Sequence, residues 1–376
     1  MIAAIIDDGI YDDAIILPKL LESYNVLSDG SIKKRGDEKG ALTHGTMCAA
    51  IIHQINPDIE LIDLKILNNE GKASICALLS ALTWCYNQSI KLIHMSLGSL
   101  NYHDYLKMAS MIENLINNNT CIVSAYHNLN LKSYPASIKG VFGVRSDKGN
   151  ILKDEEYGID PYEGLSISNC FVAPSITTIK SLESKKISIA QANSFSAPIL
   201  TGHISRYLQE NESATHAQVL SHLQLNATPY KSLSCKIIPY INKGDLPIYG
   251  LVIGIISAHN MLSSKLYEIF KRNDYYVESF THSSNVPYND NSIPLSYYCD
   301  EKQIIGKSIL HTIDFIYEPD IIIIELNHDN YIIDWSTWDI LIVVKGKKIN
   351  LLTKKQSSIY DSLESLCSGI ISHFSQ

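Results

Sequence analysis

The sequence lacks the features that direct a chain out of the cell or into a membrane. Its apolar start, Met1 to Ile6, runs directly into Asp7 and Asp8, so it has no basic region, long apolar core or cleavage site of a secretory signal. The longest apolar stretch, residues 249–258, is about half as long as a membrane-spanning helix. We therefore expect a cytoplasmic protein without a membrane partner.

Cysteine pairs and an excess of positive charge are also missing. The eight cysteines are scattered, and none forms a CxxC pair or a spacing typical of zinc ligands, so we expect free thiols, no cofactor and no metal. Acidic residues outnumber basic ones by 39 to 31, giving a net charge of −8. This balance argues against a nucleic-acid partner bound through its phosphates. A net charge of this size is also usual for a soluble protein of this length.

The composition is that of a globular chain with room for two domains. Of the 376 residues, 45% are hydrophobic and 19% are charged, values that exclude wholesale disorder. At about 150 residues per domain, the length predicts two domains. We place the first over residues 1–229, a linker over 230–245 and a second domain over 246–376.

Short apolar runs alternate with helical patterns. The expected strands of the first domain cover 2–6, 59–66, 92–97 and 121–125, and the expected helices cover 45–53, 73–88 and 105–117. This alternation predicts an α/β fold, with a doubly wound, mostly parallel sheet and helices on both faces. The second, smaller domain is also α/β, from a strand over 248–257 to a closing helix over 356–374. Sites in such sheets lie at the carboxyl ends of the strands.

Four polar side chains stand at the ends of these elements. They are Asp7 after the first strand, His44 at a helix start, Asn128 after the strand over 121–125, and Ser194 before a helix with proline in its first turns. Taken singly, each has an ordinary structural explanation. A strand-end carboxylate is often solvated, serine and histidine cap helices, and asparagine favours turns.

Taken together and in this order, the patterns resemble the subtilisin-like serine peptidases, or subtilases. The segment His94-Met95-Ser96-Leu97-Gly98-Ser99 is similar to the substrate-binding segment of that family, and Phe171-Val172-Ala173-Pro174 and residues 214–223 are similar to further family blocks. The resemblance covers about residues 1–228. It implies a subtilisin-like fold and a serine endopeptidase that acts on peptides or proteins.

The resemblance also implies a role for each of the four side chains. Asp7, His44 and Ser194 would form an Asp-His-Ser triad, in the chain order of subtilisin. Ser194 would attack the scissile carbonyl, His44 would take its proton, and Asp7 would hold the imidazole in the useful tautomer. Asn128 would donate its side-chain amide to the oxyanion, together with the backbone N–H of Ser194.

Other positions would contact the substrate. Ser96, Leu97 and Gly98 would pair with an extended peptide as an added strand. His127 stands where the family has glycine, and its ring either narrows the substrate pocket or only packs. With Asp8 after Asp7, the Asp-Asp-Gly motif resembles that of the kexin-like branch of the family, which cleaves after basic residues. It is either a counter-charge for a basic substrate residue or a solvated turn residue.

Further departures surround the nucleophile and the N-terminus. Asn193 stands where the family has threonine, Ala192 where it has glycine and Phe195 where it has methionine. Only six residues precede Asp7, so we expect folding without a cleaved chaperone segment and restraint by narrow specificity. Residues 246–376 would supply that specificity.

We expect a processing peptidase that removes a leader or precursor segment from a small ribosomally made peptide, which would be its partner. Two alternatives stay open. One is a general intracellular degradative subtilase, and the other is a catalytically inactive pseudo-peptidase that binds peptides.

Overall fold

The computed structural model describes most of the chain. The described residues are 1–11, 19–36, 42–100, 102–128, 133–159, 170–175, 191–230, 248–257, 262–281, 293–294, 310–311, 313–314, 319–326, 338–345, 348–353 and 357–374. The chain divides into two compact units, Met1–Leu233 and Ser234–Gln376. Apart from residue 230, the predicted linker over 230–245 lies outside the described residues.

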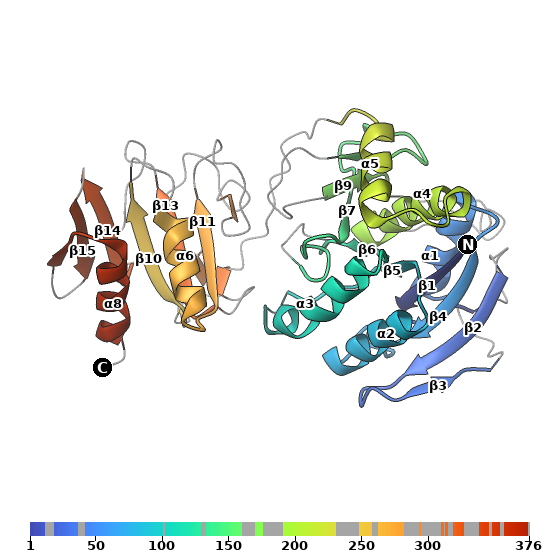
Figure 1. Ribbon diagram of the computed structural model, residues 1–376, viewed down its shortest axis with the longest axis horizontal. Helices are drawn as coiled ribbons and strands as arrows, with labels where there is room; N and C mark the ends of the chain where they lie inside the picture. The colour runs from blue at the N-terminus through green and yellow to red at the C-terminus, as the bar shows by residue number, and fades with distance from the viewer. Residues whose placement is uncertain are drawn as a thin grey trace. The chain divides into compact units, whose positions relative to one another are not determined.

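The first unit is built on a nine-stranded sheet in the order β3-β2-β4-β1-β5-β6-β7-β9-β8 (Figure 1). The strands are β1 (Ile2–Asp7), β2 (Lys19–Val26), β3 (Ile32–Lys34), β4 (Glu60–Lys65), β5 (Leu92–Met95), β6 (Cys121–Ala125), β7 (Phe142–Ser146), β8 (Gly158–Ile159) and β9 (Cys170–Ala173). All neighbours pair in parallel except β2 with β3 and β8 with β9. The predicted mostly parallel sheet is therefore confirmed.

Helices cover both faces of this sheet. They are α1 (His44–Ile55), α2 (Ile75–Asn87), α3 (Tyr102–Asn117), α4 (Ala197–Glu210) and α5 (His216–Asn226). α1, α4 and α5 share one core with alternate residues of the central strands, such as Ala3, Ile5 and Val123. α2 and α3 pack against each other outside this core, with α3 against β6. Because both its faces are covered, β1 is buried from Ala3 to Asp7.

The adjacent strands β1 and β5 mark the switch point of the sheet. From β1 the chain continues to β2, β3 and β4, which all lie on one side of β1, and from β5 it continues through α3 to β6 on the other side. Ligand sites of open α/β sheets lie at the carboxyl ends of strands at such a point. Asp7 ends β1, and Ser96 and Asn128 follow β5 and β6 at this same edge.

α1 and α4 approach closely because residue 202 has no side chain. A Cβ atom on Gly202 would lie 2.4 Å from the Cβ of Ile55. α1 begins at His44, and α4 begins three residues after Ser194. This contact therefore packs α1, which begins with His44, against the helix that follows Ser194.

The second unit holds a seven-stranded sheet in the order β12-β11-β13-β10-β14-β15-β16. The strands are β10 (Leu251–Ile256), β11 (Val277–Thr281), β12 (Ile293–Pro294), β13 (Ile321–Leu326), β14 (Ile340–Lys345), β15 (Lys348–Thr353) and β16 (Ser357–Tyr360). The pairs from β12 to β14 are parallel, and β15 and β16 add antiparallel to β14. The helices α6 (Leu262–Arg272) and α8 (Leu363–Phe374) share one core with this sheet.

The predicted closing helix over 356–374 is wrong in its first part. Residues 357–360 form β16, where Tyr360 pairs with Ile349 of β15. The helix begins only after Ser362, whose hydroxyl accepts a hydrogen bond from the Ser365 N–H at 3.2 Å. A serine at this position caps a helix start, so the strand and the helix are separated by a cap.

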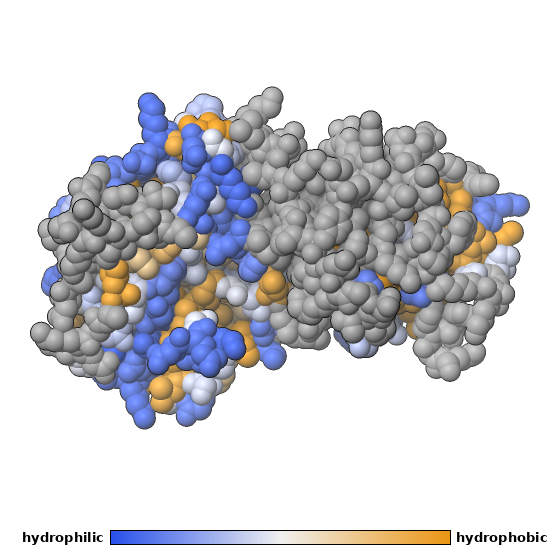
Figure 2. Space-filling model, turned by 180° about the vertical axis from the view of Figure 1, so that it is seen from behind, coloured by the Kyte–Doolittle hydropathy of each residue, from blue (hydrophilic) through white to orange (hydrophobic). Residues whose placement is uncertain are grey.

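Few large apolar side chains are exposed on the described surface. No helix in the described ranges is long and apolar enough to cross a membrane. The exposed large hydrophobic residues are Ile2, Leu27, Tyr86, Ile151, Leu225, Tyr249 and Ile359. Figure 2 shows hydrophobic and hydrophilic side chains interspersed on the face that it presents. Single exposed apolar side chains are usual on protein surfaces.

Replacing Gly202 by alanine tests the contact between α1 and α4. We expect the free energy of unfolding, measured with urea, to fall by about 1–3 kcal/mol because the new methyl group overpacks against Ile55. Gly36→Ala is the control, since a Cβ there meets no atom within 4 Å. Its change should stay within about 0.5 kcal/mol. Equal effects of the two substitutions would contradict the close approach.

Candidate active site

His44 lies against the carboxylate of Asp7. Its Nδ1 is 3.1 Å and 3.0 Å from the two carboxylate oxygens. Asp7 is fully buried at the end of β1, whereas His44 opens α1 and is partly exposed. Because Asp7 binds Nδ1, Nε2 is the nitrogen left to accept a proton.

The start of α1 is tied to the turn that follows Asp7. The two carboxylate oxygens of Asp8 accept hydrogen bonds from the backbone N–H groups of His44, at 3.1 Å, and Gly45, at 2.8 Å. Glycine is required at position 45 because a Cβ there would lie 2.8 Å from the carbonyl oxygen of Gly9. Helix starts leave such N–H groups without partners, and an acidic side chain there is favourable. The strand end that carries Asp7 therefore also fixes His44.

Asp8 thus has a structural contact that the sequence did not predict. Burial raises the pKa of its half-buried carboxyl, and the hydrogen bond from the Gly45 N–H opposes that shift. The predicted role of Asp8 as a counter-charge for the substrate stays a prediction.

The turn beyond Asp8 is anchored by a buried ion pair. The guanidinium of Arg35 donates to a carboxylate oxygen of Asp63 in β4 and to the carbonyl of Ile10, the latter at 2.9 Å. The same carboxylate accepts the Ile10 N–H at 2.9 Å. These bonds hold the turn after β1 against the next strand.

Ser194 lies in a short 3-10 turn, η2 (Asn193–Phe195), directly before α4. Its carbonyl accepts a hydrogen bond from the Ser96 hydroxyl at 2.8 Å, and the Phe195 ring lies 4.9 Å from the His44 ring. Among the described residues, the Ser194 hydroxyl has no hydrogen bond to His44. Contacts of this kind are often long without substrate and tighten when it binds.

Asn128 lies beside the turn that carries Ser194. Its Oδ1 accepts the backbone N–H of Asn193 at 2.9 Å, which leaves the amide nitrogen of this exposed side chain free to donate elsewhere. The neighbouring His127 is half-buried, and burial lowers the pKa of its imidazole. The His127 N–H donates to the Ser133 hydroxyl at 3.0 Å.

The predicted substrate-binding segment, Ser96 to Gly98, follows β5 at the same edge. Gly98 is exposed, and a Cβ on it would lie 3.1 Å from the carbonyl oxygen of Tyr134. The next residue, Ser99, forms an antiparallel bridge with Tyr134. The structure therefore brings all the predicted site residues to one edge of the sheet.

Cys48 is a neighbour of the site that the sequence analysis did not assign. Its sulfur is 3.8 Å from His44 Nδ1, 3.7 Å from the Ser96 hydroxyl and 3.6 Å from the Ser194 carbonyl. The signal was its position four residues after His44, which places both side chains on one face of α1.

His94 is the second unassigned neighbour. It is fully buried, with Nε2 2.9 Å from the Ser96 hydroxyl and Nδ1 2.8 Å from the Thr201 hydroxyl. Burial lowers the pKa of His94 to about 4, so the ring is neutral near pH 7. Since Ser96 donates to the Ser194 carbonyl, Nε2–H donates to Ser96, and the Thr201 hydroxyl also donates to the Ala197 carbonyl at 3.1 Å.

One group of side chains has the donor set of a metal site. Asp7, His44 and Cys48 each offer one ligand atom, and these atoms lie within 4.8 Å of one another. A metal ion bound there would compete with the hydrogen bond between Asp7 and His44.

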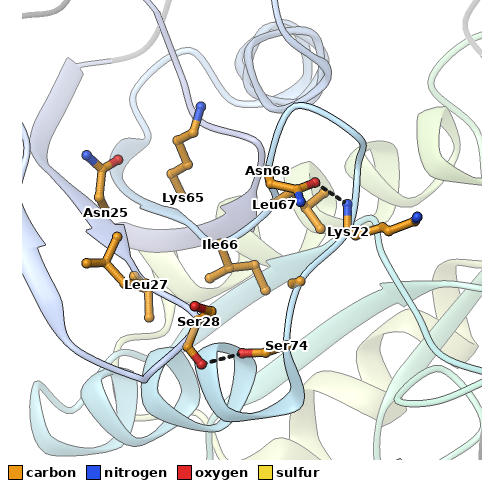
Figure 3. Close-up of a pocket in the computed structure, with 11 residues that line it drawn as sticks. Asn25, Leu27, Ser28, Lys65, Ile66, Leu67, Asn68, Lys72 and Ser74 are labelled. Atoms are coloured by element: carbon orange, nitrogen blue, oxygen red, sulfur yellow. Dashed lines mark hydrogen bonds between the residues drawn. The ribbon is translucent and has the colours of Figure 1, made fainter.

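A pocket of about 480 Å³ with a mixed polar and apolar lining opens at the same edge of the sheet (Figure 3). Lys65, which lines it, is the register partner of Asp7 on the neighbouring strand β4. Two hydrogen bonds hold its wall: the Ser74 hydroxyl donates to the Ser28 carbonyl at 2.8 Å, and the Lys72 N–H donates to Asn68 Oδ1 at 3.0 Å. The pocket is thus one strand away from the candidate residues.

Comparisons with known proteins agree on one family. The family model described as "Subtilase family" matches residues 1–243. Subtilisin BL of Lederbergia lenta is 25% identical over 198 residues, which are 49% of this chain and 70% of that protein. Subtilisin-like protease 3 of Plasmodium falciparum is 26% identical over 263 residues, 61% of this chain and 32% of that protein.

A solved structure, the nisin leader peptidase NisP from Lactococcus lactis, is also similar. It matches 61% of this chain and 83% of its own with a TM-score of 0.46 and 16% sequence identity.

Removing the sulfur of Cys48 is expected to lower the pKa of His44. Burial raises the pKa of the Cys48 thiol and keeps it neutral near pH 7, so its sulfur raises the pKa of His44 as a hydrogen-bond acceptor 3.8 Å from Nδ1. The Asp7 carboxylate also raises the pKa of His44, and burial of the ring opposes both. In Cys48→Ala, the titration of the His44 ring, followed by NMR and assigned with His44→Gln, should move to lower pH.

Cys85→Ala is the control, because Cys85 is equally buried but lies in α2. It should leave the His44 titration unchanged. An unchanged titration in Cys48→Ala would show that the sulfur does not act on the ring.

Proposed function

The chain belongs to the subtilase family of serine endopeptidases, and on that premise we propose that Asp7, His44 and Ser194 form its catalytic triad. The observation that carries this proposal is the pair of short contacts between His44 Nδ1 and the buried Asp7 carboxylate, beside the turn that holds Ser194. The order of the three residues in the chain is that of subtilisin.

Each residue has one task in the proposed reaction. His44 Nε2 takes the proton of the Ser194 hydroxyl as that oxygen attacks the substrate carbonyl, and the imidazolium then passes the proton to the leaving amine. Asp7 holds the ring by Nδ1 and stabilises the imidazolium. Water releases the acyl group from Ser194 in the second half of the reaction.

The oxyanion is stabilised by Asn128 and by the backbone N–H of Ser194. Since Asn128 Oδ1 accepts the Asn193 N–H, its Nδ2 is the part of the amide that faces outward to donate. The N–H of Ser194 belongs to the turn before α4, where helix-start N–H groups favour negative charge.

A fluorophosphonate probe tests the triad. We expect labelling at Ser194, its loss in Ser194→Ala, and a strong decrease in His44→Ala and Asp7→Asn. For peptide hydrolysis, Asn128→Ala should lower kcat by about 10²–10³, the usual cost of removing one oxyanion donor.

Ser221→Ala is the matched control, because Ser221 is exposed on α5. It should be labelled like the unaltered protein. If the unaltered protein is not labelled, the chain is a pseudo-peptidase and the triad proposal is wrong.

The substrate we propose is the leader or precursor segment of a small ribosomally made peptide. The support is the second unit: it begins at Ser234, has its own sheet and core, and lies almost wholly outside the family match. A folded part of this size beyond the peptidase unit favours selection of a particular substrate. Localisation in the cytoplasm belongs to the same proposal.

Substrate profiling tests this specificity. We expect unfolded casein to be largely spared, while a few members of a peptide library are cut, with a basic residue near the cleavage point. In Asp8→Ser the preference for a basic residue should fall at least tenfold, the effect of removing about 1.4 kcal/mol of charge attraction. Serine retains the ability to accept a hydrogen bond at the start of α1.

Two results would contradict these expectations. Rapid degradation of casein would favour the general degradative subtilase. An unchanged preference for basic residues in Asp8→Ser would restrict Asp8 to holding α1.

A further inference from the structure

Asn193, which directly precedes Ser194, is buried with 1% exposure and makes four side-chain hydrogen bonds among the described residues. Its Oδ1 accepts the Ser146 N–H at 2.8 Å and the Ser146 hydroxyl at 2.9 Å. Its Nδ2 donates to the carbonyls of Tyr126, at 3.3 Å, and His127, at 2.9 Å. These bonds use both donors and both acceptor sites of the carboxamide.

These partners lie around the proposed oxyanion site. Tyr126 and His127 are the two residues before Asn128, and Ser146 ends β7, the strand next to β6. The backbone N–H of Asn193 holds Asn128 Oδ1. One residue therefore connects the nucleophile turn to the Asn128 loop by both its backbone and its side chain.

We propose that Asn193 is the positioning residue of the oxyanion site, an inference that rests on the proposed function. Its carboxamide fixes the backbone that leads to Asn128, and its N–H fixes the direction of the Asn128 amide. Asn193 itself does not touch the reacting atoms. It acts through Asn128.

The residue type follows from the geometry. A threonine, with one hydroxyl donor on a shorter side chain, cannot bind both carbonyls. The two departures from the family at this place are in direct contact, because Asn193 Nδ2 binds the carbonyl of His127. The chain therefore has a histidine in place of glycine at 127 together with the longer asparagine in place of threonine at 193.

Loss of the hydrogen bonds of the Asn193 side chain should weaken stabilisation of the transition state more than it weakens substrate binding. In Asn193→Thr, at least one of the carbonyls of Tyr126 and His127 loses its hydrogen bond to residue 193, which favours a shift of the loop. The predicted substrate-binding segment, Ser96 to Gly98, follows β5, and in the described part of the chain it makes no hydrogen bond to the Asn193 side chain. We therefore expect kcat to fall and KM to change little.

A double-mutant cycle with a fluorophosphonate probe tests the proposal. We expect Asn193→Thr to lower the rate of Ser194 labelling by about 10–100-fold, the scale of a misplacement near 1 Å. In the Asn128→Ala background, the same substitution should change the rate by less than about twofold, because the group through which it acts is absent. An equal loss in both backgrounds would overturn the proposal.

Asn56→Ala is the matched control. Asn56 is 3% exposed, and its Nδ2 donates to Ser205 at 2.9 Å and to Gln209 at 3.1 Å, which joins the end of α1 to α4. It should lower Tm but keep the labelling rate within about twofold. If Asn193→Thr behaves in the same way, the residue is only structural and the proposal is wrong.

Ser146→Ala gives a milder test that does not depend on the folding of Asn193→Thr. It removes one of the four hydrogen bonds, and we expect a three- to tenfold slower labelling, about the effect of one such bond. An unchanged labelling rate in Ser146→Ala would contradict the positioning role of Asn193. Absence of labelling in the unaltered protein would overturn the proposed function and this inference with it, whereas normal labelling with insensitive Asn193 variants overturns the inference alone.

Discussion

The first unit depends on a buried carboxylate at the end of its central strand. A charge without solvent access is costly unless hydrogen bonds replace the lost water. Asp7 receives the Asp8 N–H at 2.8 Å and the His44 ring. Asp8 then holds the first N–H groups of α1. The need to satisfy one buried charge therefore determines where α1 starts and how its first side chain is oriented.

A second chain of polar groups lies behind the site. It runs from Thr201 on α4 through His94 and Ser96 to the carbonyl of Ser194. Every donor in this series of hydrogen bonds has an acceptor when His94 is neutral, and the lowered pKa of His94 keeps its ring neutral. Buried networks of this kind rigidify a site because each member is fixed by the next. The hydrogen bonds of Asn193 do the same for the turn that holds Ser194.

The sequence predicted the parts of the site that depend on local patterns. Asp7 could be found because an apolar strand ends there, and the doubly wound sheet followed from the alternation of strands and helices. Pairing across the sheet was not visible locally: β2 carries mixed polarity, and residues 357–360 became a strand because β15 offers an edge. The contacts of Asn193 depend on Ser146, 47 residues away, so only the unusual residue type could be noticed.

The position of Ser194 in the chain has a consequence for synthesis on the ribosome. Asp7 and His44 emerge early, but Ser194 and α4 follow about one hundred and fifty residues later. α4 also fills the core face that α1 shares with β1 and β6. The helix that directly follows Ser194 is therefore also a part of the core on which α1 packs. A nascent chain that ends before Ser194 lacks both Ser194 and the helix that packs against α1 in this core.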